Sequence, residues 1–223
     1  FISEAIIQGT FGKPIVRKVA IEIVNKLDVF TNFESRQDVA VRIVENLNNF
    51  SPPELQQDVA GRIVEKLVDF NDLENQKSFA EAIVNNKFGK EIPEVVAQKI
   101  AEKLSVFTDL EAQRNISYAI AFGRFGKPIP ELVAQKIAEK IAGNLDFFRD
   151  VYSQRWISLA INAGRLGEPI PEVLAEKVAE NLDLFTDPFA QRDISEAIGS
   201  GKFGDPIPEL VAQKIAEKIA GNL

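Results

Sequence analysis

The side chains of this chain that could do chemistry are carboxylates, arginines and a few aromatic rings. Asp109 with Glu111, and Asp183 with Asp187, are near enough in sequence to suggest an acid/base pair or a calcium site. An EF-hand loop needs alternating acidic ligands around a central glycine, and the sequence has no such pattern. We therefore expect these acids on solvent-facing surfaces or in first helical turns, where they complement the helix dipole.

Cysteine, histidine and methionine are absent from the chain. Their absence excludes disulfides, thiol nucleophiles, imidazole bases and thioether ligands, and with them a Ser-His-Asp triad and a His/Cys zinc site. We expect a protein that is not an enzyme and that has no catalytic residues, cofactor, metal or small-molecule substrate.

Three arginines, each preceded by glutamine, recur at Arg114, Arg155 and Arg192. Such a row could bind acidic groups along one edge, because guanidinium offers a planar fork of donors. The alternative is an ion pair with an acid of the preceding connector, such as Asp109 or Asp150. The net charge of −7 favours the ion pairs.

The segment Phe125–Pro130 reads Phe-Gly-Lys-Pro-Ile-Pro and resembles a glycine-rich loop. A phosphate-binding loop needs more glycines between a strand and a helix, followed by Lys-Ser/Thr, and the segment lacks both features. We interpret it as a connector between two helices. The alternative is a small-anion site at the start of the following helix.

The elements that position these residues belong to a tandem repeat. Residues 128–145 recur unchanged at 206–223, and self-alignment gives a unit of a short helix, a Gly/Pro connection and a longer helix. The short helices are expected to begin near the following residues: Lys77, Arg114, Arg155 and Arg192.

Each helix of the unit has its own pattern. The longer helix has apolar residues three and four positions apart, as at Val133, Ile137 and Ile141, with alanines beside them that allow close helix packing. The short helix ends at glycine or asparagine, as at Gly123, which suits a left-handed cap. The large apolar residue that follows, such as Phe125, is expected to anchor the loop.

These patterns predict an all-α protein of tandem helix-pair repeats, an α-solenoid or an elongated helical bundle, with about 11 to 12 helices. We expect one continuous array over residues 1–223, cut from a longer one. Its predicted units are residues 1–35, 36–56, 57–76, 77–113, 114–154, 155–191 and 192–223. The second and third match the longer helix alone, so we expect a bend or an irregular bundle near residues 36–76.

Charge and hydropathy restrict the partners. An acidic chain repels phosphate backbones, so nucleic acid is an unfavourable partner. The sequence has no run of about 18 uncharged apolar residues, so we expect no membrane span.

Two local patterns resemble known families. Residues 156–182 combine an aromatic helix, Ala-Gly-Arg-Leu, a proline turn and Leu-Ala-x-x-Val-Ala-x-x-Leu. This order of sequence elements resembles the α-helical repeat domains of spider silk proteins. That resemblance implies extracellular structural assembly, although this chain has few serines and many charges. Residues 140–144 resemble a fragment of TAL-effector-like DNA-binding repeats, but the acidic charge and the different period argue against DNA binding.

Two function classes follow. Outer positions of the longer helices repeat, as in Gln98-Lys99 and Gln135-Lys136, whereas recognition of one partner usually needs different side chains in each unit. We therefore predict a structural or self-assembling module whose partner is a protein, with a secreted location favoured over a cytoplasmic one. The alternative is a protein- or peptide-binding scaffold, which would use the variable short helices and their connectors. Its candidate interaction face comprises Glu81, Arg114, Tyr118, Arg155, Trp156, Leu159, Arg192 and Glu196.

Overall fold

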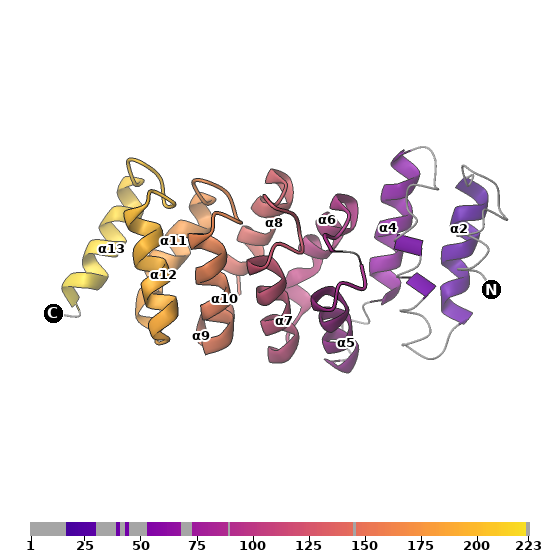
Figure 1. The fold of residues 1–223 in the computed structure, drawn as a ribbon, viewed down its shortest axis with the longest axis horizontal. Coiled ribbons are helices and arrows are strands. Elements are labelled where there is room, and N and C mark those ends of the chain that lie inside the picture. The colour runs from indigo at the N-terminus through magenta and orange to yellow at the C-terminus, as the bar shows by residue number, and fades with distance from the viewer. Residues whose placement is uncertain are drawn as a thin grey trace.

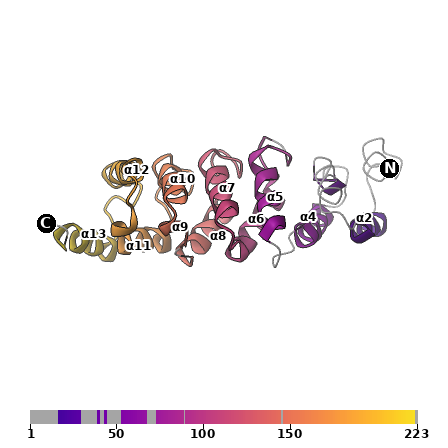
Figure 2. The same ribbon diagram turned by 90° about the horizontal axis from the view of Figure 1, so that it is seen from below.

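The computed structural model describes residues 17–29, 39–40, 43–44, 53–67, 73–88, 90–144 and 146–221. Within these ranges every regular element is a helix, which confirms the all-α class (Figure 1). The helices form an elongated row in two layers, which separate when the molecule is seen from below (Figure 2). The predicted total of 11 or 12 helices includes segments outside the described residues.

Each layer is a row of neighbouring helices. Layer A consists of α5 (Leu73–Val84), α7 (Leu110–Ala121), α10 (Val151–Asn162) and α12 (Pro188–Gly199). Layer B consists of α2 (Arg17–Asn25), α4 (Pro53–Leu67), α6 (Glu94–Lys103), α8 (Glu131–Ala142), α11 (Glu172–Glu180) and α13 (Glu209–Gly221). Connections contain α9 (Asp146–Arg149) and the 3₁₀ helices η1 (Lys26–Val29), η3 (Leu104–Val106) and η4 (Leu182–Leu184). Each helix packs against the next one in its own layer.

The layer A helices begin one turn earlier than predicted. Asp109 caps α7, and its side chain accepts a hydrogen bond from the Ala112 N–H at 2.9 Å. Asp150 and Asp187 cap α10 and α12 in the same way. Aspartate is a favoured N-cap because its carboxylate satisfies a free N–H of the first turn. As a result α7 and α8 both have 12 residues, so the predicted short and long helices are equal in length in this unit.

The ends of the layer A helices confirm the predicted caps. Gly123 has a φ of 70° and Asn86 a φ of 59°, the left-handed conformation expected at these positions. The apolar residues after the caps anchor the loops, and all are buried: Phe88, Phe125, Leu166 and Phe203. Loops of successive units are also joined, because the Ile92 N–H donates to the Arg124 carbonyl at 2.7 Å.

Buried glutamines connect one unit to the next. Gln154 on α10 donates from Nε2 to the Phe148 and Leu184 carbonyls, both at 2.6 Å, and its Oε1 accepts from the Thr186 N–H at 3.1 Å. Gln154 thus binds the connector before its own helix and the connector of the following unit. We call this arrangement the glutamine clamp.

The forward half of the glutamine clamp recurs at Gln76 but not at Gln113. Gln76 donates to the Val106 carbonyl at 3.1 Å and accepts from the Thr108 and Asp109 N–H groups. Gln113 bonds only backward, to the Phe107 carbonyl at 2.8 Å, and its Oε1 has no hydrogen-bond partner. The connector that follows Gln113 differs from the others because it contains α9.

Layer B packs through small residues and ion pairs. Ala97, Ala134 and Ala138 are buried, as predicted from their place beside the apolar stripe. Lys136 on α8 pairs with Glu102 on α6, and Lys214 on α13 pairs with Glu180 on α11 at 2.6 Å. These contacts join equivalent positions of successive units, so the layer B surface repeats along the array.

Of the range 36–76, where a bend was predicted, the structure describes residues 39–40, 43–44, 53–67 and 73–76. Within that range, α4 packs against both α2 and α6, so it continues the row of layer B. None of the helices in the described ranges is long and apolar enough to cross a membrane.

We expect Gln154→Ala to lower the free energy of unfolding by about 1–3 kcal/mol, because backbone groups of two connectors lose their partner. Urea unfolding followed by circular dichroism measures the loss. The matched control is Gln135→Ala, since Gln135 is exposed on α8 and donates only to Glu139. Its expected effect is within about 0.5 kcal/mol. Equal losses in the two variants would contradict the role of the glutamine clamp.

Candidate functional site

A continuous chain of ring and guanidinium contacts crosses three helices of layer A. We call it the aromatic–arginine row, and its members are Tyr118, Phe122, Arg155, Trp156, Phe189 and Arg192. It begins with Tyr118 and Phe122 on α7, whose rings stack with centroids 4.3 Å apart. Trp156 on α10 meets the Tyr118 ring edge-on at 5.2 Å and lies 5.6 Å from Phe122. This geometry is favourable between aromatic rings.

Two arginines continue the row toward α12. The Arg155 guanidinium carbon lies 5.6 Å from the centroid of Trp156 and 4.3 Å from that of Phe189. The Arg192 guanidinium carbon lies 5.6 Å from the Phe189 centroid. These distances are within the range of cation–π attraction. The row therefore alternates rings and positive charges over α7, α10 and α12.

Part of this apolar surface faces solvent. Phe122 is 40% exposed, Phe189 47% and the neighbouring Tyr152 56%. Tyr152 lies one turn before Arg155 and Trp156 on α10, and the Arg114 guanidinium lies 4.9 Å from its ring centroid. Large exposed aromatic side chains gathered on one face of a folded protein usually mark an interaction site.

The aromatic residues are not needed to pack the repeat. The position of Tyr118 is occupied by Glu81 in α5 and by Glu196 in α12, and the position of Trp156 is Ser78 in α5. The pairs α5–α7 and α10–α12 nevertheless pack side by side as α7–α10 does. Unit stacking therefore does not require rings at these positions.

The arginines of the repeat have different partners in each unit. Arg114 forms three hydrogen bonds of 2.7–3.1 Å with the carboxylate of Asp150, whose side chain is 8% exposed. Lys77, at the same position in α5, lies 4.0 Å from Asp109. The predicted pairing with the preceding connector is wrong, because both cations reach the N-cap of the following unit. The N-cap aspartates point toward that neighbouring helix, which sequence spacing did not reveal.

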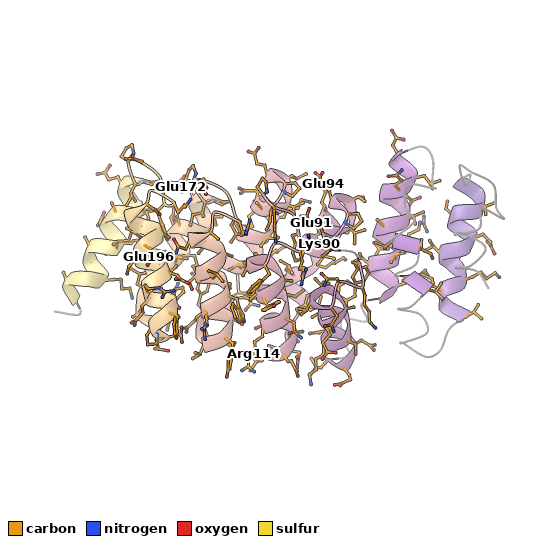
Figure 3. All side chains as sticks on the ribbon, in the orientation of Figure 1. Lys90, Glu91, Glu94, Arg114, Glu172 and Glu196 are labelled. Carbon is orange, nitrogen blue, oxygen red and sulfur yellow. The ribbon has the colours of Figure 1, made fainter. Side chains whose placement is uncertain are left out.

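Arg155 and Arg192 depart from this arrangement. Asp187, which corresponds to Asp150, caps α12, and Arg155 has no carboxylate contact within the described residues. Arg192 instead pairs with the buried Asp193 at 2.9 Å and with Glu196 at 3.7 Å. Figure 3 places Arg114 at the lower end of α7 and Glu196 on α12.

The structure brings most of the predicted interaction face together. Arg114, Tyr118, Arg155, Trp156 and Arg192 lie in the row or beside it. Glu196 joins α12 to α10 by accepting a hydrogen bond from Asn162 at 2.9 Å.

Two members of the predicted face lie apart from the row. Leu159 is half-buried and packs against the core, and Glu81 is exposed on α5. Sequence reasoning missed Phe122, Tyr152 and Phe189. The four-residue spacing from Tyr118 to Phe122, and from Tyr152 to Trp156, would have placed each pair on one helix face.

The carboxylates considered at first have structural partners. Asp109 caps α7, Asp187 caps α12, and Asp183 pairs with Lys218 at 2.7 Å. Among the residues that the structure describes, there is no group of three or more acids that could hold a metal ion. The segment Phe125–Pro130 connects α7 to α8, as interpreted from its sequence.

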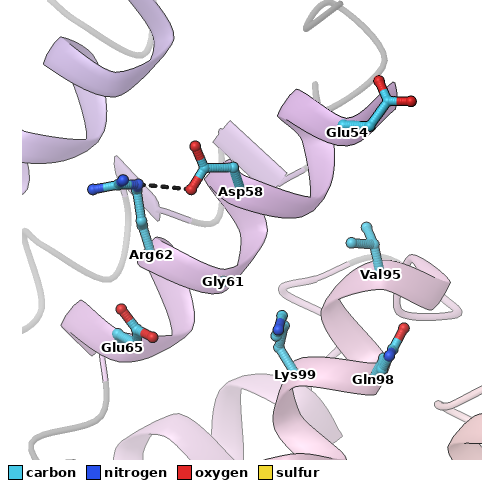
Figure 4. A pocket seen from close by; sticks show the side chains of 8 residues that line it. All are labelled: Glu54, Asp58, Gly61, Arg62, Glu65, Val95, Gln98 and Lys99. Carbon is cyan, nitrogen blue, oxygen red and sulfur yellow. Dashed lines mark hydrogen bonds and ion pairs between the residues drawn. The ribbon is translucent and has the colours of Figure 1, made fainter. Parts of the chain in front are cut away.

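A polar groove of about 500 Å³ lies between α4 and α6 (Figure 4). It exists because Gly61 occupies the position that Gln98 has in the next helix of layer B. The groove is lined by Glu54, Asp58, Gly61, Arg62, Glu65, Val95, Gln98 and Lys99. Asp58 accepts a hydrogen bond from Arg62 at 2.9 Å, and Val95 is the one large apolar lining residue. The groove therefore lacks the apolar surface typical of a small-molecule site.

Comparison of the chain with protein-family models, with curated proteins and with solved structures found no match. The resemblance to spider silk repeat domains stays a prediction.

The Arg114–Asp150 pair predicts a pH-dependent stability. Burial raises the pKa of Asp150, but hydrogen bonds from Arg114 and from the Ser153 N–H outweigh burial and leave this pKa below its ordinary value. The pair therefore contributes fully above the unfolded pKa of about 3.9 and loses its contribution as pH falls through the lower folded value.

We expect Arg114→Ala to lower the free energy of unfolding by about 1–2 kcal/mol at pH 7, a value reduced for the exposure of Arg114. The difference from the unaltered chain should shrink below about pH 4. Urea unfolding at pH 7 and pH 3 measures both values. Lys140→Ala, a cation of layer B, serves as the control and should show no such pH dependence. A deficit of equal size at both pH values would contradict the role of the pair.

Proposed function

We propose that this array is a non-enzymatic scaffold that binds a protein through the aromatic–arginine row. The observation that supports it is a partly solvent-exposed set of rings and guanidinium groups over three helices, at ring positions where the α5 unit has only polar residues. The uniform positions that favoured a purely structural role belong to layer B. The variable positions belong to layer A, so a uniform stacking surface and a specific binding surface coexist in one chain.

The chemistry of the row suits protein recognition. Tryptophan, tyrosine and arginine are the residues most enriched where interfaces gain most of their affinity. Aromatic rings offer a large contact area at a small cost in conformational entropy, because they have two side-chain torsions. Ring–ring and ring–guanidinium contacts already hold the row together in the free chain. A partner therefore meets side chains that are largely ordered before binding.

Site-specific photo-crosslinking in an extract of the source organism tests this proposal. A benzophenone side chain replaces Tyr152 beside the row or, as a control, the exposed Gln135 of layer B. We expect a discrete adduct at position 152 that weakens at least fivefold when Phe189→Ala is added, because that change removes a ring of the row. Adducts of equal yield at the two positions, or adducts indifferent to Phe189→Ala, would overturn the proposal.

A second candidate function, self-assembly, is favoured by the outward surface of α12 and α13. Gln191 donates to the Phe185 carbonyl at 2.7 Å, as Gln154 does to that of Phe148, but Gln191 is exposed. Ala212 is likewise exposed on α13, whereas the corresponding Ala134 is buried. This surface therefore matches faces that the next unit covers elsewhere in the array. A further unit of the same kind could pack on this surface, including a unit of a second copy of the chain.

Light scattering after size exclusion, over a range of protein and salt concentrations, tests self-assembly. We expect larger species at higher protein concentration, and more of them when salt screens the −7 charge. Ala212→Glu should suppress them by placing a charge in the stacking surface. Gln213→Glu is the matched control, because the corresponding Gln135 stays exposed inside the array. A monomer under all conditions would exclude this function for the chain.

A further inference from the structure

We propose that Arg155, flanked by Trp156 and Phe189, is the anchor for a carboxylate of the bound protein, and that the partner presents an acidic segment with an apolar residue beside its acid. This inference rests on the proposed scaffold function and specifies the chemistry of the ligand.

The first step is the difference between Arg155 and its counterparts. Arg114 is held by Asp150 at 2.7 Å and Arg192 by Asp193 at 2.9 Å. Within the described residues, Arg155 contacts rings and no carboxylate. Among the cations of the described layer A helices, Lys77, Arg114 and Arg192 have carboxylate partners, and Arg155 has none.

The second step is that the repeat does not need Arg155 to join its units. Between α7 and α10 the glutamine clamp is incomplete at Gln113, and the Arg114–Asp150 pair forms the forward contact. Between α10 and α12 the clamp is complete, because Gln154 binds both Leu184 and Thr186. At this junction Arg155 makes no ion pair with the following unit, unlike Lys77 and Arg114 at theirs.

The third step is the position of the Arg155 guanidinium. Its carbon lies 4.3 Å from the Phe189 centroid, so the group is supported by a ring rather than by an acid. A guanidinium that stacks on a ring keeps its in-plane N–H donors for an acceptor at its edge. A carboxylate matches that fork with two parallel hydrogen bonds, which makes it the preferred acceptor.

The fourth step is the apolar surface next to the anchor. Trp156, Tyr118 and Phe122 form one ring cluster that Arg155 contacts through Trp156, and the half-exposed Phe189 also contacts the Arg155 guanidinium. A ligand carboxylate on Arg155 therefore places adjacent ligand side chains over rings. A leucine-like side chain next to the aspartate or glutamate of the ligand would contact these rings. A purely acidic sequence would have only the ion pair with Arg155.

The chain carries its own reporter, because Trp156 is its single tryptophan. The test titrates the full chain with the peptide acetyl-Glu-Leu-Asp-Leu-Glu-amide and follows Trp156 emission. The matched peptide acetyl-Gln-Leu-Asn-Leu-Gln-amide has the same shape without charge. We expect saturable binding of the acidic peptide, at least tenfold tighter than that of the matched peptide.

Three variants separate the anchor from general electrostatics and from misfolding. Arg155→Gln should weaken binding of the acidic peptide at least tenfold, and Arg155→Lys severalfold, because lysine keeps the charge but loses the fork. Arg149→Gln makes the same charge change at an exposed residue of α9 and should leave binding within twofold. Circular dichroism confirms that each variant is folded.

Equal binding of the two peptides, or equal losses in Arg155→Gln and Arg149→Gln, would overturn the inference. A tighter, saturable response to a ten-nucleotide oligothymidylate would overturn the acidic segment as the occupant. Failure of the peptide test alongside a specific crosslink at position 152 rejects the ligand chemistry and leaves the scaffold function standing. Failure of both tests rejects the scaffold function as well.

Discussion

The contact on which this architecture depends most is the hydrogen bonding of a connector by the glutamine of the preceding layer A helix, which is present at the α5–α7 and α10–α12 junctions. A connector between two helices leaves backbone groups without helical partners, and burying them unpaired costs more than apolar packing returns. Gln76 and Gln154 remove this cost at two junctions, and the buried phenylalanines of the connectors, such as Phe107 and Phe185, can then fill the space between the layers. The helices can thus stack because the backbone groups of the connectors have hydrogen-bond partners.

The two layers have different roles in the repeat: layer B supplies the repeated stacking contacts, and layer A has outward positions that vary between units. Layer B repeats its buried alanines, and equivalent lysine–glutamate pairs join α6 to α8 and α11 to α13. Layer A must preserve only the capping aspartate, the glutamine and the inward apolar positions. Its outward positions are free to differ, and the rings of α7, α10 and α12 lie at such positions. Stability in repeat arrays is close to a sum of units and their interfaces, so local change at the surface leaves the rest intact.

Much of the fold could be predicted from the sequence because the repeat makes each pattern visible several times. The stripe at Val133 and Ile137 and the left-handed cap at Gly123 are local features, and the structure confirms them. The starts of the layer A helices were placed a turn too late, because apolar periodicity begins at Ile116 whereas the helix begins at its aspartate cap. The candidate site could be predicted only in part. Which arginine lacks an acid depends on contacts between units about 37 residues apart, such as Arg114 with Asp150, and no single unit reveals them.

The forward bonds of the glutamine clamp join one unit to the following one, which has an evolutionary consequence. Residues 128–145 and 206–223 are identical and lie 78 positions apart, the length of two units. Duplicating residues 128–205 in frame would place a helix with the sequence of α8 after α11, and the chain already contains that layer B junction as α11–α13. A gene of this kind can therefore lengthen or shorten by recombination while its layer B junctions stay the same. Selection is then left to act on the outward side chains of the copies.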